Sequence, residues 1–441
     1  MENGKGIKQA MKENQRCARE LLAFIEKSPS SFHVVENIRE ALSNQGFEEL
    51  LETQEWQIQP GGNYYVIRNG SSIIALQIPE NTGWKGFHIT ASHSDSPSFR
   101  VKEEPEICVE GHYVKLNTER YGGMILSTWM DRALSVAGRV AFWDEEKGEV
   151  STRLVNIDRD LFVIPSVAIH LNRDINKGVE YNPQKDMLPL FAEGGSDGGK
   201  GLLRKELARA AQVKEEEILG QDIFLYVREK GKILGAKEEF VLSPRLDDLQ
   251  CVYASLRAFL ESRPKNYINL CVVFDNEEVG SGTKQGADST FLEDTLFRAA
   301  KGLGLGREGL LSMIAGSFFI SADNAHGVHP NHPELSDPTS RPYLNGGIVI
   351  KYHGGQKYAT DAVSAAKMKH ICSQAKVPWQ TYANRSDILG GSTLGNLSEA
   401  HVSLSCVDIG LPQLAMHSAV ETAGVRDTEY AVKALKQFWQ E

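Results

Sequence analysis

Paired cysteines, long apolar runs and an excess of positive charge are all missing from this sequence. Its six cysteines never stand in CxxC spacing, which argues against a thiolate zinc site or a disulfide framework and fits a reducing compartment. No apolar run approaches membrane-spanning length, and the charged N-terminus lacks the apolar core of a signal peptide. The net charge of -10 argues against nucleic acid and anionic membranes as main partners. We therefore expect a cytoplasmic protein.

The order of the predicted elements indicates an α/β fold that is interrupted by a second domain. The 441 residues, 41% of them hydrophobic and 24% charged, are too many for one core of ordinary size. From Leu242 onward predicted strands and helices alternate, which is typical of a mixed, largely parallel sheet with helices on both faces. Short predicted strands, among them Leu161–His170, fill residues 97–238. We predict an α/β/α sandwich of residues 1–96 and 239–441, with a mainly β insertion at 97–238.

Two glycine patterns predict local structure. Asn69-Gly70, between the predicted strands Tyr64–Arg68 and Ser72–Ile78, indicates a two-residue hairpin turn. Residues 194–200 have the spacing of a Walker-A phosphate loop, but Gly201 stands where Ser or Thr must reach magnesium. We interpret this second stretch as a flexible loop and not as a phosphate site.

The stretch around which the chain is organised follows the apolar run Ile268–Val273. This run predicts a buried strand that delivers Asp275, Asn276, Glu277 and Glu278 to its C-terminal end, where ligands bind in open α/β sheets. Two adjacent carboxylates cannot both stay ionised in a dry pocket without a cation. The pattern suits one glutamate on a metal and its neighbour as a base. The alternative is a solvated turn that carries surface acids.

Other candidate metal ligands stand at the ends of predicted strands or at helix starts. Together with Glu278 they are His93, Asp247, Asp323 and His417. Each has an ordinary alternative: a core histidine, a helix cap, an Asx turn and a histidine packed in a helix, respectively. As a set, two imidazoles and three carboxylates suit two borderline cations such as zinc, which sit about 3.5–4 Å apart in hydrolytic sites. Asp95 is placed to orient His93 through its second ring nitrogen.

Five motifs, in order, make the sequence similar to the aspartyl aminopeptidase family of dinuclear zinc exopeptidases. They are His93-Ser94-Asp95-Ser96-Pro97, Ser243-Pro244-Arg245-Leu246-Asp247, Asp275-Asn276-Glu277-Glu278-Val279-Gly280-Ser281, Ser321-Ala322-Asp323-Asn324-Ala325-His326 and Met416-His417-Ser418. The resemblance covers nearly the whole chain. It implies that His93 and Asp323 bind one metal, that Glu278 and His417 bind the other, and that Asp247 bridges them. It also implies that Glu277 is the general base and that Asp95 lies behind His93.

The same resemblance assigns roles outside the metal set. It implies that the insertion is a dimerisation domain, that dimers assemble into a tetrahedral dodecamer, and that His170 reaches a neighbouring active site. A histidine at a strand end is the alternative for His170. An acidic first residue would be selected by a pocket that includes Lys351, Tyr358 and His326, although a strand-end lysine is also a common surface charge. Arg385–Ser392 departs from the family's pattern, and so does Asp248, which replaces an asparagine.

We therefore predict a metalloaminopeptidase that acts on peptides with a free N-terminus, preferring Asp or Glu. It is expected to hold two divalent ions, zinc with cobalt or manganese as the other options. Glu277 would take a proton from the activated water and pass it to the departing amine. The alternatives are a neutral or broad aminopeptidase, a carboxypeptidase or deacylase on a related scaffold, and a catalytically silent scaffold. The complete ligand set argues against the last, because a silent protein has no physical need for so many costly polar groups in one pocket.

Overall fold

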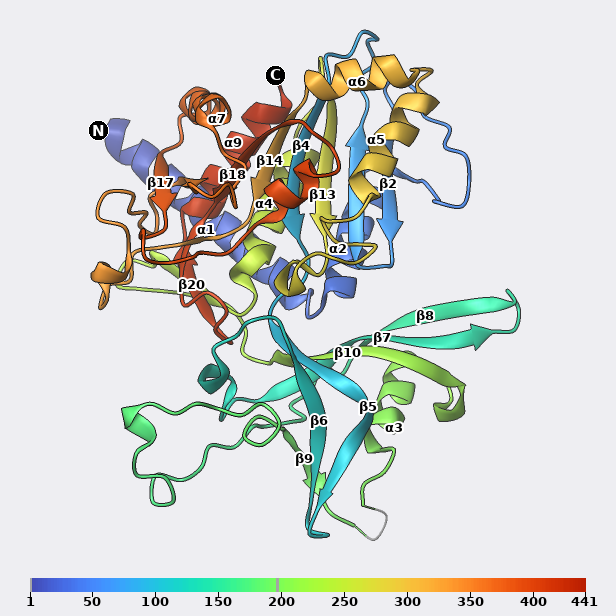
Figure 1. The fold of residues 1–441 in the computed structure, drawn as a ribbon, viewed down its shortest axis with the longest axis vertical. Coiled ribbons are helices and arrows are strands. Elements are labelled where there is room, and N and C mark those ends of the chain that lie inside the picture. The colour runs from blue at the N-terminus through green and yellow to red at the C-terminus, as the bar shows by residue number, and fades with distance from the viewer. Residues whose placement is uncertain (1, 196–197) are drawn as a thin grey trace. The chain divides into compact units, whose positions relative to one another are not determined.

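A computed structural model describes residues 2–195 and 198–441 and shows a mixed α/β protein, which confirms the predicted fold class (Figure 1). The chain forms two compact units. The first contains the chain up to Asp95, Gly231–Met416 and Glu421–Glu441, and the second contains Ser96–Lys230 with His417–Val420. Within the described residues, no helix is both long enough and apolar enough to cross a membrane.

A mixed sheet, nine-stranded in the described part of the chain, forms the centre of the first unit. Its strands, in spatial order, are β1 (Glu48–Glu49), β2 (Asn63–Arg68), β3 (Ser72–Gln77), β13 (Ile268–Phe274), β4 (Phe87–His93), β14 (Phe318–Ala322), β18 (Ser405–Gly410), β16 (Ile348–Tyr352) and β17 (Trp379–Ala383). β13, β4, β14 and β18 run parallel to one another. Their carboxyl ends therefore meet at one edge of the sheet, where ligands bind in such folds.

Helices cover both faces of this sheet. One core packs α1 (Glu2–Glu26), α2 (Ser31–Ser43), α4 (Leu246–Leu260), α7 (Ala362–Ala375) and α9 (Asp427–Trp439) on the sheet. The other core packs α5 (Phe291–Gly302), α6 (Arg307–Ala315) and α8 (Leu394–Glu399) on the opposite face. In β13, Cys271 and Val273 join the first core, whereas Leu270, Val272 and Phe274 join the second. Because successive strand residues point to opposite faces, a strand covered on both sides is apolar at nearly every position, and in β13 only the buried Asn269 departs from this rule.

The predicted hairpin between β2 and β3 is confirmed. Asn69 and Gly70 both have positive φ, 58° and 70°, and Arg68 pairs with Ser72 across the turn. Positive φ at both central residues defines a type I′ turn, whose twist matches that of the flanking strands. The local sequence thus determines the register of this edge of the sheet.

A smaller sheet of the first unit contains the strand that precedes α4. Within the described residues it has five strands: β11 (Lys232–Leu234), β12 (Phe240–Ser243), β20 (Glu421–Gly424), β19 (Pro412–Leu414) and β15 (Ala325–His326). β12 leads into α4, and it pairs with β20 so that Ser243 lies opposite Glu421. This pairing brings a glutamate close to the first turn of α4.

The second unit is mainly β. Its antiparallel sheet consists, in the described residues, of β8 (Glu149–Asn156), β7 (Leu134–Asp144), β10 (Ile218–Val227), β5 (Ser98–Val109), β6 (Tyr113–Tyr121) and β9 (Leu190–Glu193), accompanied by α3 (Leu202–Ala211). The expected strand Leu161–His170 is wrong. Only Phe162 and Val163 form isolated bridges there. Pro165 has no N–H to donate to a neighbouring strand, and the residues after it are exposed.

The glycine-rich stretch at 194–201 falls partly on residues 196–197, which lie outside the described residues. The helix that follows it, α3, begins next to an acid: the Leu203 N–H donates to Glu106 Oε1 at 2.9 Å. A carboxylate at this position repels phosphate and already occupies one of the N–H groups that a phosphate would need. This contact supports our interpretation that the stretch is not a phosphate site.

His88 makes the stability of the first unit sensitive to acid. Its ring is buried in β4 and stacked between Tyr267, with centroids 3.7 Å apart, and Phe438, with centroids 4.2 Å apart. Burial, together with the Lys367 ammonium, lowers the pKa of His88 to about 3. The unfolded chain, with a histidine pKa of about 6.5, therefore binds more protons than the folded chain as the pH falls from about 6.5 to 3.

We predict that His88→Phe, which keeps an aromatic ring in the stack, makes unfolding less sensitive to acid. Relative to the variant, the wild-type free energy of unfolding should fall by about 1.4 kcal/mol per pH unit below pH 6. Urea unfolding at pH 7 and pH 5 measures this difference. Equal losses in the two proteins over this range would contradict the assignment of a neutral, buried His88.

Candidate metal centre

His93 stands at the carboxyl end of β4, between the ends of two parallel neighbours. β13 lies on one side of β4 and leads to Glu277 and Glu278, and β14 lies on the other side and leads to Asp323. Asp247 reaches the same place from the first turn of α4. Three parallel strands and one helix start thus bring together side chains that are far apart in the sequence.

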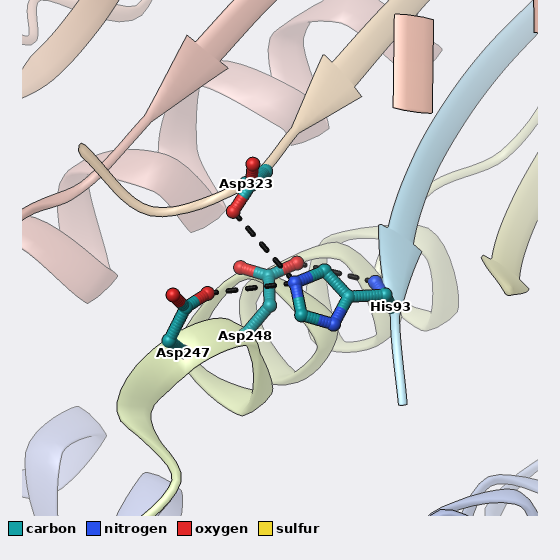
Figure 2. A group of neighbouring side chains, drawn as sticks. All are labelled: His93, Asp247, Asp248 and Asp323. Carbon is teal, nitrogen blue, oxygen red and sulfur yellow. Dashed lines mark hydrogen bonds and ion pairs between the residues drawn. The ribbon is translucent and has the colours of Figure 1, made fainter. Parts of the chain in front are cut away.

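The side chains of His93, Asp247, Asp248 and Asp323 form one buried cluster (Figure 2). His93 Nε2 lies 3.4 Å from Asp247 Oδ1 and 3.7 Å from Asp323 Oδ1. Two ligand atoms that are each about 2.1 Å from a tetrahedral zinc lie about 3.4 Å apart. The spacing of these donor atoms therefore fits a shared metal ion.

A second group extends the cluster towards the turn after β13. Glu277 and Glu278 begin the 3₁₀ turn Glu277–Val279 and each offers a carboxylate oxygen within 4.8 Å of a His93 ring nitrogen. Carboxylate oxygens of Glu278 and Asp247 also lie within 4.8 Å of each other. Asp247 thus belongs both to the group around His93 and Asp323 and to a group with Glu278.

The electrostatics show how crowded these acids are. Burial, followed by the charges of neighbouring carboxylates such as Asp323 and Asp95, raises the pKa of Glu277 to about 8. Burial and Asp247 raise the pKa of Glu278 well above its ordinary value. Burial would lower the pKa of His93, but Asp247, Asp323 and Asp95 raise it instead. A divalent cation among these groups reverses this trend, because it favours ionised carboxylates and neutral imidazole.

Asp95 ties the His93 strand to the glutamate turn. Its carboxylate accepts the backbone N–H groups of Glu277 and Glu278 at 3.2 and 3.1 Å. His93 Nδ1 lies 3.3 Å from Asp95 Oδ1 and 3.1 Å from the Asp95 carbonyl oxygen. Asp95 therefore lies behind His93 and also fixes the backbone of both glutamates. These backbone contacts could not be predicted from the sequence, because they join residues 182 and 183 positions apart.

Two further acids contact the centre, and sequence reasoning did not place them there. Asp248 is fully buried and accepts the backbone N–H of His93 at 3.2 Å. Glu421 is also buried and accepts the backbone N–H of Asp247 at 3.0 Å. Asp248 could have been suspected from its position next to Asp247. For Glu421 the sequence carries no such signal, because the four-residue strand β20 also contains the half-buried polar residue Thr422.

Lys351 extends the site along the edge of the sheet. It is buried in β16, and its Nζ lies 3.4 Å from Asp323 Oδ2 and 5.5 Å from the centre of the Tyr358 ring. Burial alone would lower the pKa of Lys351, but Asp323 and other nearby charges raise it, so the ammonium stays charged. His326 is exposed, with its ring 6.1 Å from that of Tyr382. Tyr382 in turn lies 6.4 Å from the Tyr358 ring.

Two of the predicted site residues belong to the second unit. His417 begins the segment His417–Val420, and its carbonyl accepts the N–H of Ile125 at 3.0 Å. His170 is exposed in the irregular segment after Pro165. The proposed roles of His417 as a metal ligand and of His170 at a neighbouring site stay predictions.

Comparisons with known proteins identify the family. A family profile described as aminopeptidase I zinc metalloprotease (M18) matches residues 24–439. A probable M18 family aminopeptidase 2 from Clostridium novyi (strain NT) is 46% identical over 431 residues, which are 97% of this chain and 100% of the relative.

Solved structures agree with this. A cryo-EM structure of the Ape4 and Nbr1 complex has a TM-score of 0.92 and 36% identity, and the match covers 98% of this chain and 86% of that chain. A structure of the S. cerevesiae mApe1 dodecamer has a TM-score of 0.84 and 27% identity, with 96% of each chain covered. The predicted resemblance is thereby confirmed. The chain belongs to the M18 family of zinc metalloproteases and is an aminopeptidase.

Proposed function

We propose that this aminopeptidase uses two divalent metal ions, most simply zinc, to remove N-terminal Asp or Glu from peptides. The observation that carries the proposal is the position of Asp247. Its carboxylate shares one buried group with His93 and Asp323 and another with Glu278. A carboxylate common to two ligand groups is the usual bridge of a two-metal hydrolytic site.

The chemistry then follows from the residues around these ligands. When bound, the ions polarise the scissile carbonyl and lower the pKa of the attacking water. Glu277 accepts a proton from that water and gives it to the departing amine. The Asp95 carboxylate accepts the backbone N–H of Glu277 and so fixes the turn that carries the proposed base. The backbone of Glu277 thus stays fixed while its carboxylate exchanges a proton.

The preference for an acidic first residue rests on Lys351. A buried ammonium beside the metal ligand Asp323 offers a charge-assisted hydrogen bond to a substrate carboxylate. In a low-dielectric pocket such a bond also disfavours substrates without an acceptor, because the Lys351 N–H groups that Asp323 does not engage then stay unsatisfied. The Tyr358 ring, 5.5 Å from Nζ, and His326 are the other proposed pocket residues.

A neutral or broad aminopeptidase is the second candidate. Lys351 already pairs with Asp323, so its charge is partly satisfied before any substrate enters. Segment 385–392, which departs from the family's pattern, exposes Ile388 and Leu389. These two observations favour an apolar first residue, and substrate selection distinguishes the two candidates.

We further propose that the chain assembles with copies of itself through the inserted β domain. The mApe1 structure, 27% identical to this chain, is a dodecamer, and this supports a homo-oligomer here.

All six cysteines lie within the described residues and are free thiols, which supports a reducing compartment such as the cytoplasm.

Replacing the proposed base should separate metal binding from turnover. We predict that Glu277→Gln keeps its bound metal but loses about 10²–10⁴-fold in kcat, because the amide cannot accept the proton. Zinc content by elemental analysis and release of the first residue from an Asp peptide measure the two effects. Glu308→Gln, an exposed glutamate on α6, is the matched control. Wild-type kcat in Glu277→Gln would remove this residue from the mechanism.

Removing the buried ammonium should change selectivity. We predict that Lys351→Ala lowers the Asp/Leu ratio, which is kcat/KM for an Asp peptide divided by kcat/KM for a Leu peptide, by about tenfold or more. This factor corresponds to the loss of one charge-assisted hydrogen bond. Using the ratio cancels any change in metal occupancy that follows from the loss of the Asp323 contact. Lys369→Ala, which removes an ammonium packed over Trp379, serves as the control. An unchanged ratio in Lys351→Ala would leave the neutral candidate as the better one.

A further inference from the structure

A buried acid outside the metal centre, Asp408, lies where two segments meet. Asp408 is in the middle of β18 and has no exposed surface. Its neighbour β14 carries Asp323 just beyond its end, and Ser321 pairs with Asp408 in the register of the two strands. Asp408 makes none of the metal-centre contacts described above. Its partners come from other parts of the sequence.

Asp408 uses both carboxylate oxygens to hold two separate segments. Oδ2 accepts the backbone N–H of Ala359 at 2.6 Å, and Oδ1 accepts the Thr393 hydroxyl at 2.6 Å. The backbone N–H of Asp408 also donates to Thr360 Oγ1 at 2.9 Å. Bonds to an ionised acceptor are shorter and stronger than neutral ones, so these contacts fix both segments firmly.

The first of these segments carries a wall of the proposed pocket. Ala359 directly follows Tyr358, whose ring lies 5.5 Å from Lys351 Nζ. A tyrosine side chain can keep this place only if its backbone is fixed. The contact between Asp408 and the Ala359 N–H supplies a fixed point one residue away.

The second segment is the one that departs from the family's pattern. Thr393 closes residues 385–392 and is the N-cap residue of α8. Gly395 approaches so closely that a Cβ atom there would lie 2.9 Å from both Asp408 carboxylate oxygens. The segment also returns to the pocket, because the Leu389 carbonyl lies 3.3 Å from His353 Nε2 and the His353 ring packs edge-on against Tyr358.

Charge links Asp408 to the same pocket. The Asp408 carboxylate is among the charges that raise the pKa of Lys351, after Asp323 and Tyr358. Removing this negative charge leaves the buried ammonium more dependent on Asp323. A second carboxylate that attracts Lys351, besides Asp323, helps to keep the ammonium charged and available to substrate.

We propose that Asp408 is a positioning residue for the selection of an acidic first residue: it anchors the Tyr358 segment and segment 385–393 around Lys351. This inference rests on the proposed function and deepens it. Asp408 itself does not touch the substrate. It sets the distance of the Tyr358 segment and of segment 385–393 from the buried Lys351 ammonium.

The test compares two buried aspartates with the same kind of contacts. Asp427 is fully buried and accepts the backbone N–H groups of Asn345 at 2.6 Å and Gly347 at 2.9 Å, but neither partner borders Tyr358 or segment 385–393. Asp408→Asn and Asp427→Asn each replace a fully buried carboxyl group that accepts two hydrogen bonds, at different places in the first unit. Both variants are assayed with Asp and Leu peptides, together with zinc content and thermal melting.

The proposal predicts that Asp408→Asn lowers the Asp/Leu ratio of kcat/KM about tenfold, mainly by raising KM for the Asp peptide, while zinc content stays at the wild-type level. Asp427→Asn should keep the wild-type ratio even if it melts earlier. Thr393→Val removes only one of the contacts and should lower the ratio by a smaller factor. This variant tests the proposal even if Asp408→Asn does not fold.

The outcomes separate this inference from the proposed function. A wild-type ratio in Asp408→Asn or, if that variant does not fold, in Thr393→Val would overturn the positioning role. An equal fall of the ratio in Asp408→Asn and Asp427→Asn would also overturn it, because the effect would then be a general loss of stability. Wild-type enzyme that prefers Leu would overturn the acidic selectivity itself and this inference with it.

Discussion

Carboxylates buried around a single imidazole are the constraint on which the rest of this structure depends. Asp247, Asp323 and Glu278 crowd around His93 in a space where like charges repel and water is scarce. Such a group is stable only when protons or cations neutralise it. The parallel strands, the turn after β13 and the start of α4 together present these oxygens at distances that suit a metal ion. The fold thus prepares a site that a cation completes.

Asp323 connects the metal centre to substrate selection. One of its oxygens faces His93 at 3.7 Å, and the other faces Lys351 at 3.4 Å. The carboxylate of Asp323 is thus a proposed metal ligand and also the ion-pair partner of Lys351, the proposed specificity residue. A substitution of Lys351 is therefore expected to affect metal binding, and a loss of metal is expected to affect Lys351. Asp408 attracts Lys351 as well and holds the walls of the pocket. Selectivity then depends on how strongly the Lys351 ammonium interacts with the substrate carboxylate compared with Asp323 and Asp408.

The sequence predicted elements whose signal is local and missed contacts that are distant. Strand Ile268–Phe274 was found because burial on both faces leaves an apolar run, and the two glutamates after it follow directly. The predicted strand Leu161–His170 is wrong because Pro165 interrupts the pairing that the apolar residues around it favour. The contact between Glu421 and the Asp247 backbone spans 174 residues and leaves no pattern in either segment. Contacts of this kind depend on how the sheets and helices pack in three dimensions, and a short stretch of sequence carries no information about that packing.

Anomalous diffraction from zinc-loaded crystals, recorded above and below the zinc absorption edge, tests whether Asp247 bridges two metal ions. We expect two peaks per chain, about 3.5–4 Å apart, with one Asp247 oxygen on each. One peak would also lie beside His93 and Asp323, and the other beside Glu278. A single peak, or two peaks that do not contact Asp247, would contradict the account.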